Sequence, residues 1–159
     1  MIHTIEQYIL ENNDKLYRIA YGYVKQADDA MDIVQDAIFK MLTKSNTLKN
    51  KESIKTWAYR IVVNTALDFL RKHKKVIPMD INDLPEQEAV DFYQDMDLQK
   101  AIDALPFKQK TIIMLRFYED LDLQEIASIT GDNLNTIKSR LYNALDKLKI
   151  TYQKEGSLV

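Results

Sequence analysis

The sequence contains no cysteine and only three glycines and three prolines among its 159 residues. The lack of cysteine excludes disulfides, thiolate zinc sites, iron–sulfur clusters and a cysteine nucleophile. So few turn formers argue against a β-sandwich or β-barrel, and neither a GxGxxG nor a GxxxxGK loop is found. No apolar run approaches the ~20 residues of a membrane span, and the N-terminus lacks the pattern of a secretory signal. We therefore expect a soluble, cytoplasmic, mainly helical protein.

The net charge of −2 conceals an uneven distribution along the chain. Residues 1–77 carry a net charge of +4, residues 78–103 carry −7, and residues 104–159 carry +1. The acidic segment also holds two of the three prolines, which is typical of an exposed linker. The sequence thus predicts an all-α fold of two small helical domains, 1–76 and 95–153, joined by an acidic linker over 77–94.

Apolar residues recur at helical spacing in both predicted domains. In the first domain the stripes predict a helix that ends near Gly22, a second over 28–42, and a third that begins after a capping Ser53. The third helix has Trp57, Phe69 and Leu70 among its core residues. In the second domain we expect a short helix that stops at Pro106, a helix with Pro106 in its first turn, and a short helix that ends at Gly131. A longer helix then follows, capped by Asp132 or Asn133.

The segment 123–149 has the pattern of a helix-turn-helix. Ala127 precedes Gly131 by four residues, where two helices cross closely, and glycine suits the left-handed conformation of the turn. Ile137 then packs the second helix against the first. That helix carries side chains that reach base edges and phosphates in a major groove, namely Asn135, Thr136, Lys138, Ser139, Tyr142 and Asn143, with basic Arg140, Lys147 and Lys149. The alternative is an ordinary amphipathic helix pair with a basic solvated face.

The third predicted helix carries a second polar stripe opposite its core. The stripe consists of Lys55, Tyr59, Arg60, Asn64, Asp68, Arg71, Lys72 and Lys75. Basic side chains interleaved with aromatic ones suit a nucleic-acid surface, including unpaired bases that stack on rings. The alternative is a solvated face beside a core tryptophan, and Trp57 and Tyr59 are each more typical of a core than of a contact surface.

Three segments occur in order around the acidic linker: DDAMDIVQDAIFKML at 28–42, WAYRIVVNTALDFLRKHKK at 57–75, and LPFKQKTIIMLRFYEDLDLQEIASITGDNLNTIKSRLYNALDKLK at 105–149. Their combination resembles the extracytoplasmic-function sigma factors, the minimal promoter-specificity subunits of bacterial RNA polymerase. The resemblance covers about 5–76 and 95–150. It implies an alternative sigma factor of a stress or envelope response, which is not an enzyme and needs no catalytic residue, metal or cofactor.

The resemblance also implies residue roles. The helix at 28–42 matches the family's core-binding helix, which docks on the clamp coiled coil of the largest polymerase subunit, so its contacts would be Asp29, Asp32, Gln35 and Asp36. The segment 48–57 matches the loop that captures a flipped base of the melted −10 element. The next helix would grip the −10 region through Lys55, Tyr59, Arg60, Asn64, Arg71 and Lys72. The helix-turn-helix would read the −35 element through Asn135, Thr136, Lys138, Ser139, Arg140, Tyr142, Asn143 and Lys147.

The partners implied by the resemblance are core RNA polymerase, contacted at its clamp and flap, promoter DNA, and an anti-sigma factor that is often membrane-anchored. The protein by itself would be a monomer. Relatives often carry arginine at two points of the recognition helix where this chain has Lys138 and Asn143. Lysine lacks the fork that pairs with guanine, while asparagine favours adenine. We therefore expect a −35 preference that departs from the usual one of the family.

Two other classes of protein deserve comparison. Residues 28–32 spell DDxxD, a spacing that binds Mg²⁺ with a diphosphate, but isoprenoid synthases need a longer chain and a second acidic cluster. An acidic first helical turn explains that motif better, and neither His3 nor His73 has a partner for catalysis. A dimeric helix-turn-helix regulator explains 123–149 but leaves the polar stripe at 55–75 unexplained.

Overall fold

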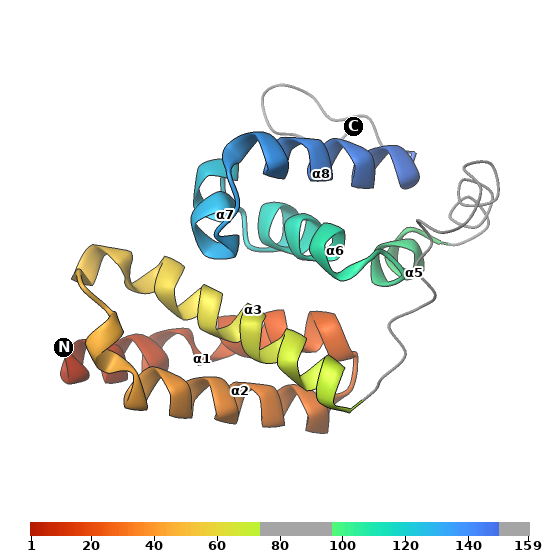
Figure 1. The fold of residues 1–159 in the computed structure, drawn as a ribbon. Helices are drawn as coiled ribbons and strands as arrows, with labels where there is room; N and C mark the ends of the chain where they lie inside the picture. The colour runs from red at the N-terminus through yellow and green to blue at the C-terminus, as the bar shows by residue number, and fades with distance from the viewer. Residues whose placement is uncertain (74–96, 150–159) are drawn as a thin grey trace. The chain divides into compact units, whose positions relative to one another are not determined.

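The computed structural model describes residues 1–73 and 97–149, and every regular element in these two ranges is helical. The chain divides into two compact units, Met1–Lys75 and Val76–Val159 (Figure 1). The predicted all-α class is therefore confirmed. The predicted linker at 77–94 and Lys75 of the polar stripe lie outside the described residues.

The first unit contains the helices α1 (Ile2–Val24), α2 (Ala27–Thr43) and α3 (Ile54–Lys72), and each of them packs against the other two. The short turns η1 (Ser45–Thr47) and η2 (Lys51–Ser53) connect α2 to α3. Figure 1 shows α1 and α2 running in opposite directions. In α1 and α2 the core is formed mainly by the stripes that the periodicity predicts, and the fully buried side chains of the unit include Ile5, Leu16, Ile19, Ile33, Met41 and Val62.

The joint between α1 and α2 lies close to Gly22, where the sequence predicts it. Lys25, not Gly22, follows the last helical residue of α1, and it adopts the left-handed conformation with φ of 53°. Its backbone N–H donates a 2.8 Å hydrogen bond to the Tyr21 carbonyl, which satisfies one of the free carbonyls of the last turn. Gly22 lies within the helix and is buried.

The buried stripe of α3 is rotated relative to the prediction. Trp57, Phe69 and Leu70 are only half-buried, whereas Tyr59 and Thr65 are each 2% exposed. Apolar residues cover a broad arc of this helix, so its periodicity leaves the orientation loosely defined. The helix start differs too, because Ser53 makes no capping bond through its side chain and Asn50 Oδ1 instead accepts from the Glu52 N–H in η2.

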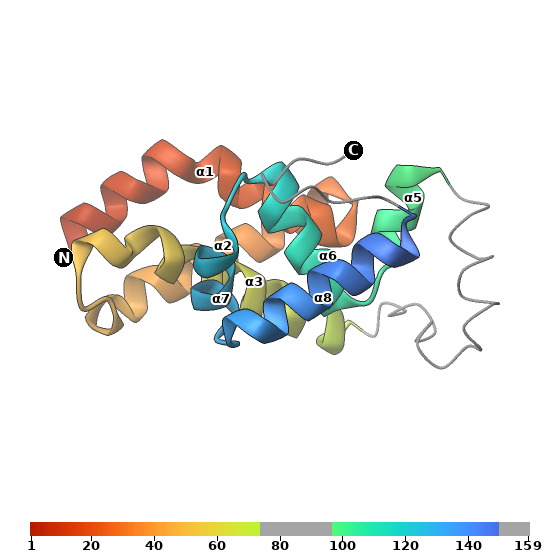
Figure 2. The same ribbon diagram turned by 90° about the horizontal axis from the view of Figure 1, so that it is seen from above.

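In the second unit, α5 (Leu98–Asp103) leads to α6 (Phe107–Ile113), which continues as a π-helical turn, η4 (Met114–Tyr118). Pro106 directly precedes α6 as its cap instead of lying in its first turn. The helices α7 (Leu123–Thr130) and α8 (Leu134–Lys147) follow, and α8 packs on both α6 and α7. Both views place α8 alongside α6 (Figures 1 and 2).

The α7–α8 pair forms the predicted helix-turn-helix, and its ends are capped locally. Asp122 and the side chain of Glu125 form a reciprocal capping box at the start of α7. Gly131 ends α7 with φ of 78°, and its N–H donates to the Ala127 carbonyl at 2.9 Å. Asn133 is the cap of α8, because its Oδ1 accepts from the Thr136 N–H at 2.8 Å. These bonds define the angle at which α8 leaves the turn.

Replacing Gly131 tests the importance of this turn. A Cβ at Gly131 would meet no atom within 4 Å, so the change acts through backbone conformation alone. We expect Gly131→Ala to lower the free energy of unfolding of the second unit by about 1 kcal/mol, and Gly131→Asn to lose less. Circular dichroism during chemical denaturation measures this loss. Fluorescence of Trp57, the only tryptophan, reports the first unit and should keep its midpoint. Equal losses for alanine and asparagine would contradict the role of the left-handed turn.

Candidate nucleic-acid and partner interfaces

The outward side of α2 presents an acidic face, which we define as Asp28, Asp32, Gln35 and Asp36, all exposed. Ala30, Ile33, Val34, Ala37 and Met41 occupy the opposite, buried side. Asp29, also expected on the outward side, is half-buried and lies within hydrogen-bond reach of the Gln26 side chain. Three of the four side chains that the resemblance assigns to core binding are therefore exposed.

Exposed apolar side chains accompany the acidic face of α2, and our sequence analysis did not identify them as candidates. Phe39 is 65% exposed and Met31 is 47% exposed. Phe39 follows Gln35 by four residues and Asp36 by three, so helical spacing alone places it on the same side. When a partner covers a large apolar side chain in that position, removal of its surface from water stabilises the complex.

The outward side of α3 presents a basic face, which we define as Arg60, Asn64, Arg71 and Lys72, all exposed. Lys55 is also exposed, in the first turn of the helix. Asp68, also exposed, interrupts this face. The expectation that Tyr59 belongs to it was wrong, because Tyr59 is buried. Val62, Val63 and Ala66 follow Tyr59 at helical spacing and are buried with it, so that its ring faces the core. The basic face thus lacks the aromatic side chain that the sequence suggested.

The indole group of Trp57 links α3 to the loop between α2 and α3. Trp57 Nε1 donates a 2.9 Å hydrogen bond to Thr47 Oγ1, and that hydroxyl donates to the Lys44 carbonyl at 2.7 Å. Leu48 anchors the same loop in the core with 4% of its surface exposed. The lysines Lys49 and Lys51 remain exposed. The loop therefore presents a cationic surface, and Trp57 and the buried Leu48 hold it in position.

The helix α8 has an outward face, which we define as Asn135, Lys138, Ser139, Tyr142 and Asn143, all exposed. Ile137, Leu141, Ala144 and Leu145 form its buried side. Thr136, expected outside, is half-buried, and its N–H is bound to Asn133. Most of the side chains expected to read DNA from this helix are thus gathered on one accessible side.

Two basic residues of α8 are engaged within their own unit. Arg140 Nη1 lies 2.6 Å from Asp132 Oδ2, and the two side chains are 23% and 33% exposed. Lys147 Nζ donates a 3.0 Å hydrogen bond to Gln109 Oε1. Both residues were expected to contact DNA, and each would have to leave or share its present partner to do so.

The described part of the chain shows no group of three or more histidine, aspartate or glutamate side chains arranged to hold a metal ion. None of the helices in that part has both the length and the apolar character that a membrane crossing requires.

Comparison with known families and proteins gives matches over both units. Residues 8–76 match Sigma-70 region 2, and residues 95–148 match Sigma-70, region 4. The chain is 50% identical over 149 residues to the RNA polymerase sigma factor SigV of Bacillus subtilis, covering 92% of this chain and 90% of that protein. It is 28% identical over 153 residues to the ECF RNA polymerase sigma factor SigW of the same organism, covering 86% and 82% respectively.

A solved structure has a similar fold. It is the sigma factor RpoE in complex with the anti-sigma factor NepR from Bartonella quintana, with a TM-score of 0.69 and 24% identity, covering 91% of this chain and 93% of that one. Because the sigma-factor matches include the first unit, they do not support a dimeric helix-turn-helix regulator, which accounted only for the C-terminal segment. The chain belongs to the extracytoplasmic-function sigma factors, the non-enzymatic initiation factors that bind core RNA polymerase and direct promoter-specific transcription.

Proposed function

We propose that this sigma factor works through three separate surfaces, one on each of the helices α2, α3 and α8. The observation that carries this proposal is that each helix buries one apolar stripe and leaves outward a face of different character. That face is acidic on α2, basic on α3 and mainly neutral and polar on α8. In this proposal the first unit binds core polymerase and the −10 element, and the second unit binds the −35 element.

The acidic face of α2 docks on the clamp coiled coil of the largest polymerase subunit. Asp32, Gln35 and Asp36 are the principal polar contacts, and Asp29 lies at the edge because it is half-buried. We add Phe39 and Met31 to this surface because they are exposed beside it. Polar side chains would then give the interface its specificity and approach rate, while the apolar ones are covered on binding.

The basic face of α3 and the loop before it bind the melted −10 element. Lys55, Arg60, Arg71 and Lys72 attract the phosphates, and Asn64 is the neutral polar side chain placed among them. Tyr59 has no place in this surface because it is buried. The segment 48–57, with the exposed Lys49 and Lys51, spans the start of α3 and is the part that we assign to capture of a flipped base.

The outward face of α8 reads the −35 element in the major groove. Lys138, Ser139, Tyr142 and Asn143 supply the groups that approach base edges, with Asn135 nearest the helix start. Arg140 and Lys147 serve mainly to hold α8 within its unit, because they pair with Asp132 and Gln109. The second unit also contacts the polymerase flap.

Regulation of this sigma factor follows from its family. The RpoE of Bartonella quintana is similar in fold and is bound by an anti-sigma factor. We place this chain in the cytoplasm as a monomer, held inactive by a cognate anti-sigma factor that is membrane-anchored.

Charge reversal tests the surface on α2. Asp32 is exposed, so Asp32→Lys should leave the melting temperature unchanged. It should weaken binding to core polymerase by roughly tenfold at low salt, because attraction to clamp cations becomes repulsion, and high salt should reduce the difference. Fluorescence titration with purified core polymerase measures the affinity. Asp14→Lys, on the exposed side of α1, is the matched control. Equal affinities for both variants would refute the assignment.

Promoter libraries randomised at each element test the two DNA surfaces. Core polymerase with the wild-type chain should transcribe specific promoters, and core alone supplies the baseline. Asn143→Ala should relax one −35 position by about 1–3 kcal/mol, whereas Lys147→Ala should leave base preference unchanged. Asn64→Ala should keep the −35 preference and slow the opening of the −10 region.

Two results would contradict this division of labour. Absence of any promoter-dependent transcript with the wild-type chain would refute the function itself. A change of −10 preference in Asn143→Ala, or of −35 preference in Asn64→Ala, would reverse the assignment of units to promoter elements.

A further inference from the structure

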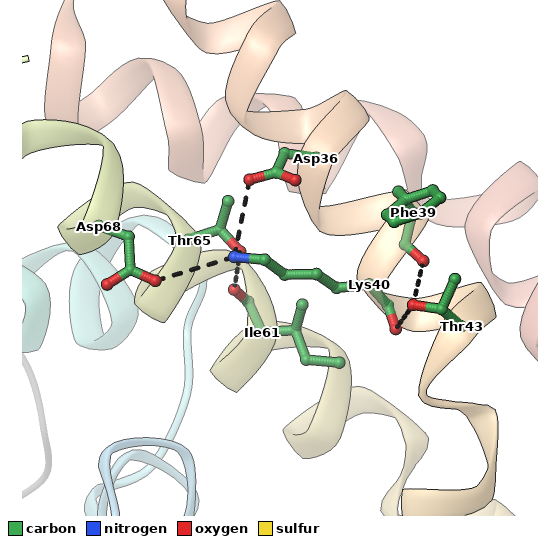
Figure 3. Close-up of polar contacts among 7 residues, drawn as sticks. All are labelled: Asp36, Phe39, Lys40, Thr43, Ile61, Thr65 and Asp68. Carbon is green, nitrogen blue, oxygen red and sulfur yellow. Dashed lines mark hydrogen bonds and ion pairs between the residues drawn. The ribbon is translucent and has the colours of Figure 1, made fainter. Parts of the chain in front are cut away.

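Lys40 of α2 reaches across to α3 and lies between two carboxylates (Figure 3). Its Nζ is 3.6 Å from Asp36 Oδ2 on its own helix and 3.8 Å from Asp68 Oδ2 on α3. It also donates a 3.1 Å hydrogen bond to the Thr65 hydroxyl, which in turn donates to the Ile61 carbonyl at 2.6 Å. The Lys40 side chain is 27% exposed, so solvent screens these contacts only in part.

The two carboxylates belong to different binding surfaces. Asp36 is a member of the acidic face of α2, and its side chain is 57% exposed. Asp68, 67% exposed, interrupts the basic face of α3, four residues after Asn64 and three before Arg71. Lys40 is thus shared between the surface proposed for core polymerase and the surface proposed for the −10 element.

Asp68 is unfavourable for DNA binding if it is left unpaired. A carboxylate within a basic face repels the phosphates that the neighbouring side chains attract. Lys40 reduces this repulsion from the core side of α3, where it is held by the buried Thr65. Asp36 competes with Asp68 for the ammonium group of Lys40. Lys40 therefore neutralises Asp68 only in part until a cation from a partner pairs with Asp36.

We propose that Lys40 is a positioning residue that couples polymerase binding to −10 recognition. When a cation of the clamp pairs with Asp36, Lys40 moves fully to Asp68 and Thr65, and the basic face of α3 loses its repulsive charge. Coupling between two binding sites is reciprocal, so bound −10 DNA also strengthens the grip on core polymerase. This inference rests on the proposed assignment of α2 to the clamp and of α3 to the −10 element.

A suppressor experiment on the reconstituted holoenzyme tests the coupling. Its readout is the dissociation constant for fork promoter DNA with a single-stranded −10 region, at saturating core polymerase. Lys40→Met keeps the length of the side chain and removes its charge, and should weaken binding about fivefold. Adding Asp68→Asn should return the affinity to within about twofold of wild type, because the charge that Lys40 neutralises is then absent. Lys15→Met, exposed on α1, removes the same charge elsewhere in the unit and should have no effect.

The Asp36→Asn variant isolates the competing carboxylate. In the free chain, without polymerase, this change should increase affinity for a single-stranded −10 oligonucleotide by about threefold, since Lys40 then serves Asp68 alone. In Lys40→Met the same change should have no effect on that affinity.

The outcomes separate a coupling role from a structural one. If Lys40→Met with Asp68→Asn binds fork DNA as weakly as Lys40→Met alone, or more weakly, Lys40 only holds α2 against α3 and the inference is refuted. An unchanged oligonucleotide affinity in Asp36→Asn refutes the competition between the two carboxylates. Failure of the wild-type holoenzyme to bind the fork DNA would instead refute the proposed function.

Discussion

The helix α2 buries one side against both α1 and α3 and leaves the other side exposed, where we propose that core polymerase binds. The helix has seventeen residues, and the buried ones lie along one side. The outward side carries polar, charged and exposed apolar side chains. Packing of Ile33, Val34 and Met41 determines the rotation of the helix, and that rotation places Asp32, Gln35 and Phe39 at the surface. The same rotation points Lys40 at α3.

The consequence is that the two surfaces proposed for the first unit lie on adjoining helices. Lys40 contacts both Asp36 and Asp68, which is the contact on which the proposed coupling between the two surfaces rests. Ion pairs of this exposure contribute little to folding stability. Their value lies in setting the electrostatic potential at the faces that partners approach.

In the second unit, the turn between α7 and α8 sets the direction of α8. Gly131 and the caps Asp122 and Asn133 satisfy the backbone groups at the turn, while Ile137 is fully buried. Arg140 and Lys147 are held by partners of the same unit. The outward face of α8 is therefore left with mostly neutral polar side chains, which favours recognition by hydrogen bonds over attraction by charge.

Apolar periodicity and local turn and capping residues were sufficient to predict much of the fold. Apolar spacing predicted the helices of both units and most of their buried side chains, although it misplaced the buried stripe of α3. The glycine turn was predictable as well, and the cap of α8 was narrowed to Asp132 or Asn133, because both are governed by residues within a few positions along the chain. The order of the three motifs was enough to identify the sigma-factor family, which the comparisons confirm.

Contacts between helices were decided only by the tertiary structure. Tyr59 is buried, and Trp57 turns its indole N–H to Thr47, because α3 packs with a rotation that a broad apolar arc leaves undetermined. Likewise, Lys40 meets Asp68, and Lys147 meets Gln109, from positions 28 and 38 residues apart in the chain. The sequence alone determined where helices form and how they end, since that depends on local chemistry and helical spacing. Which side chains meet depends on how the helices pack, because that packing brings together groups that no local pattern connects.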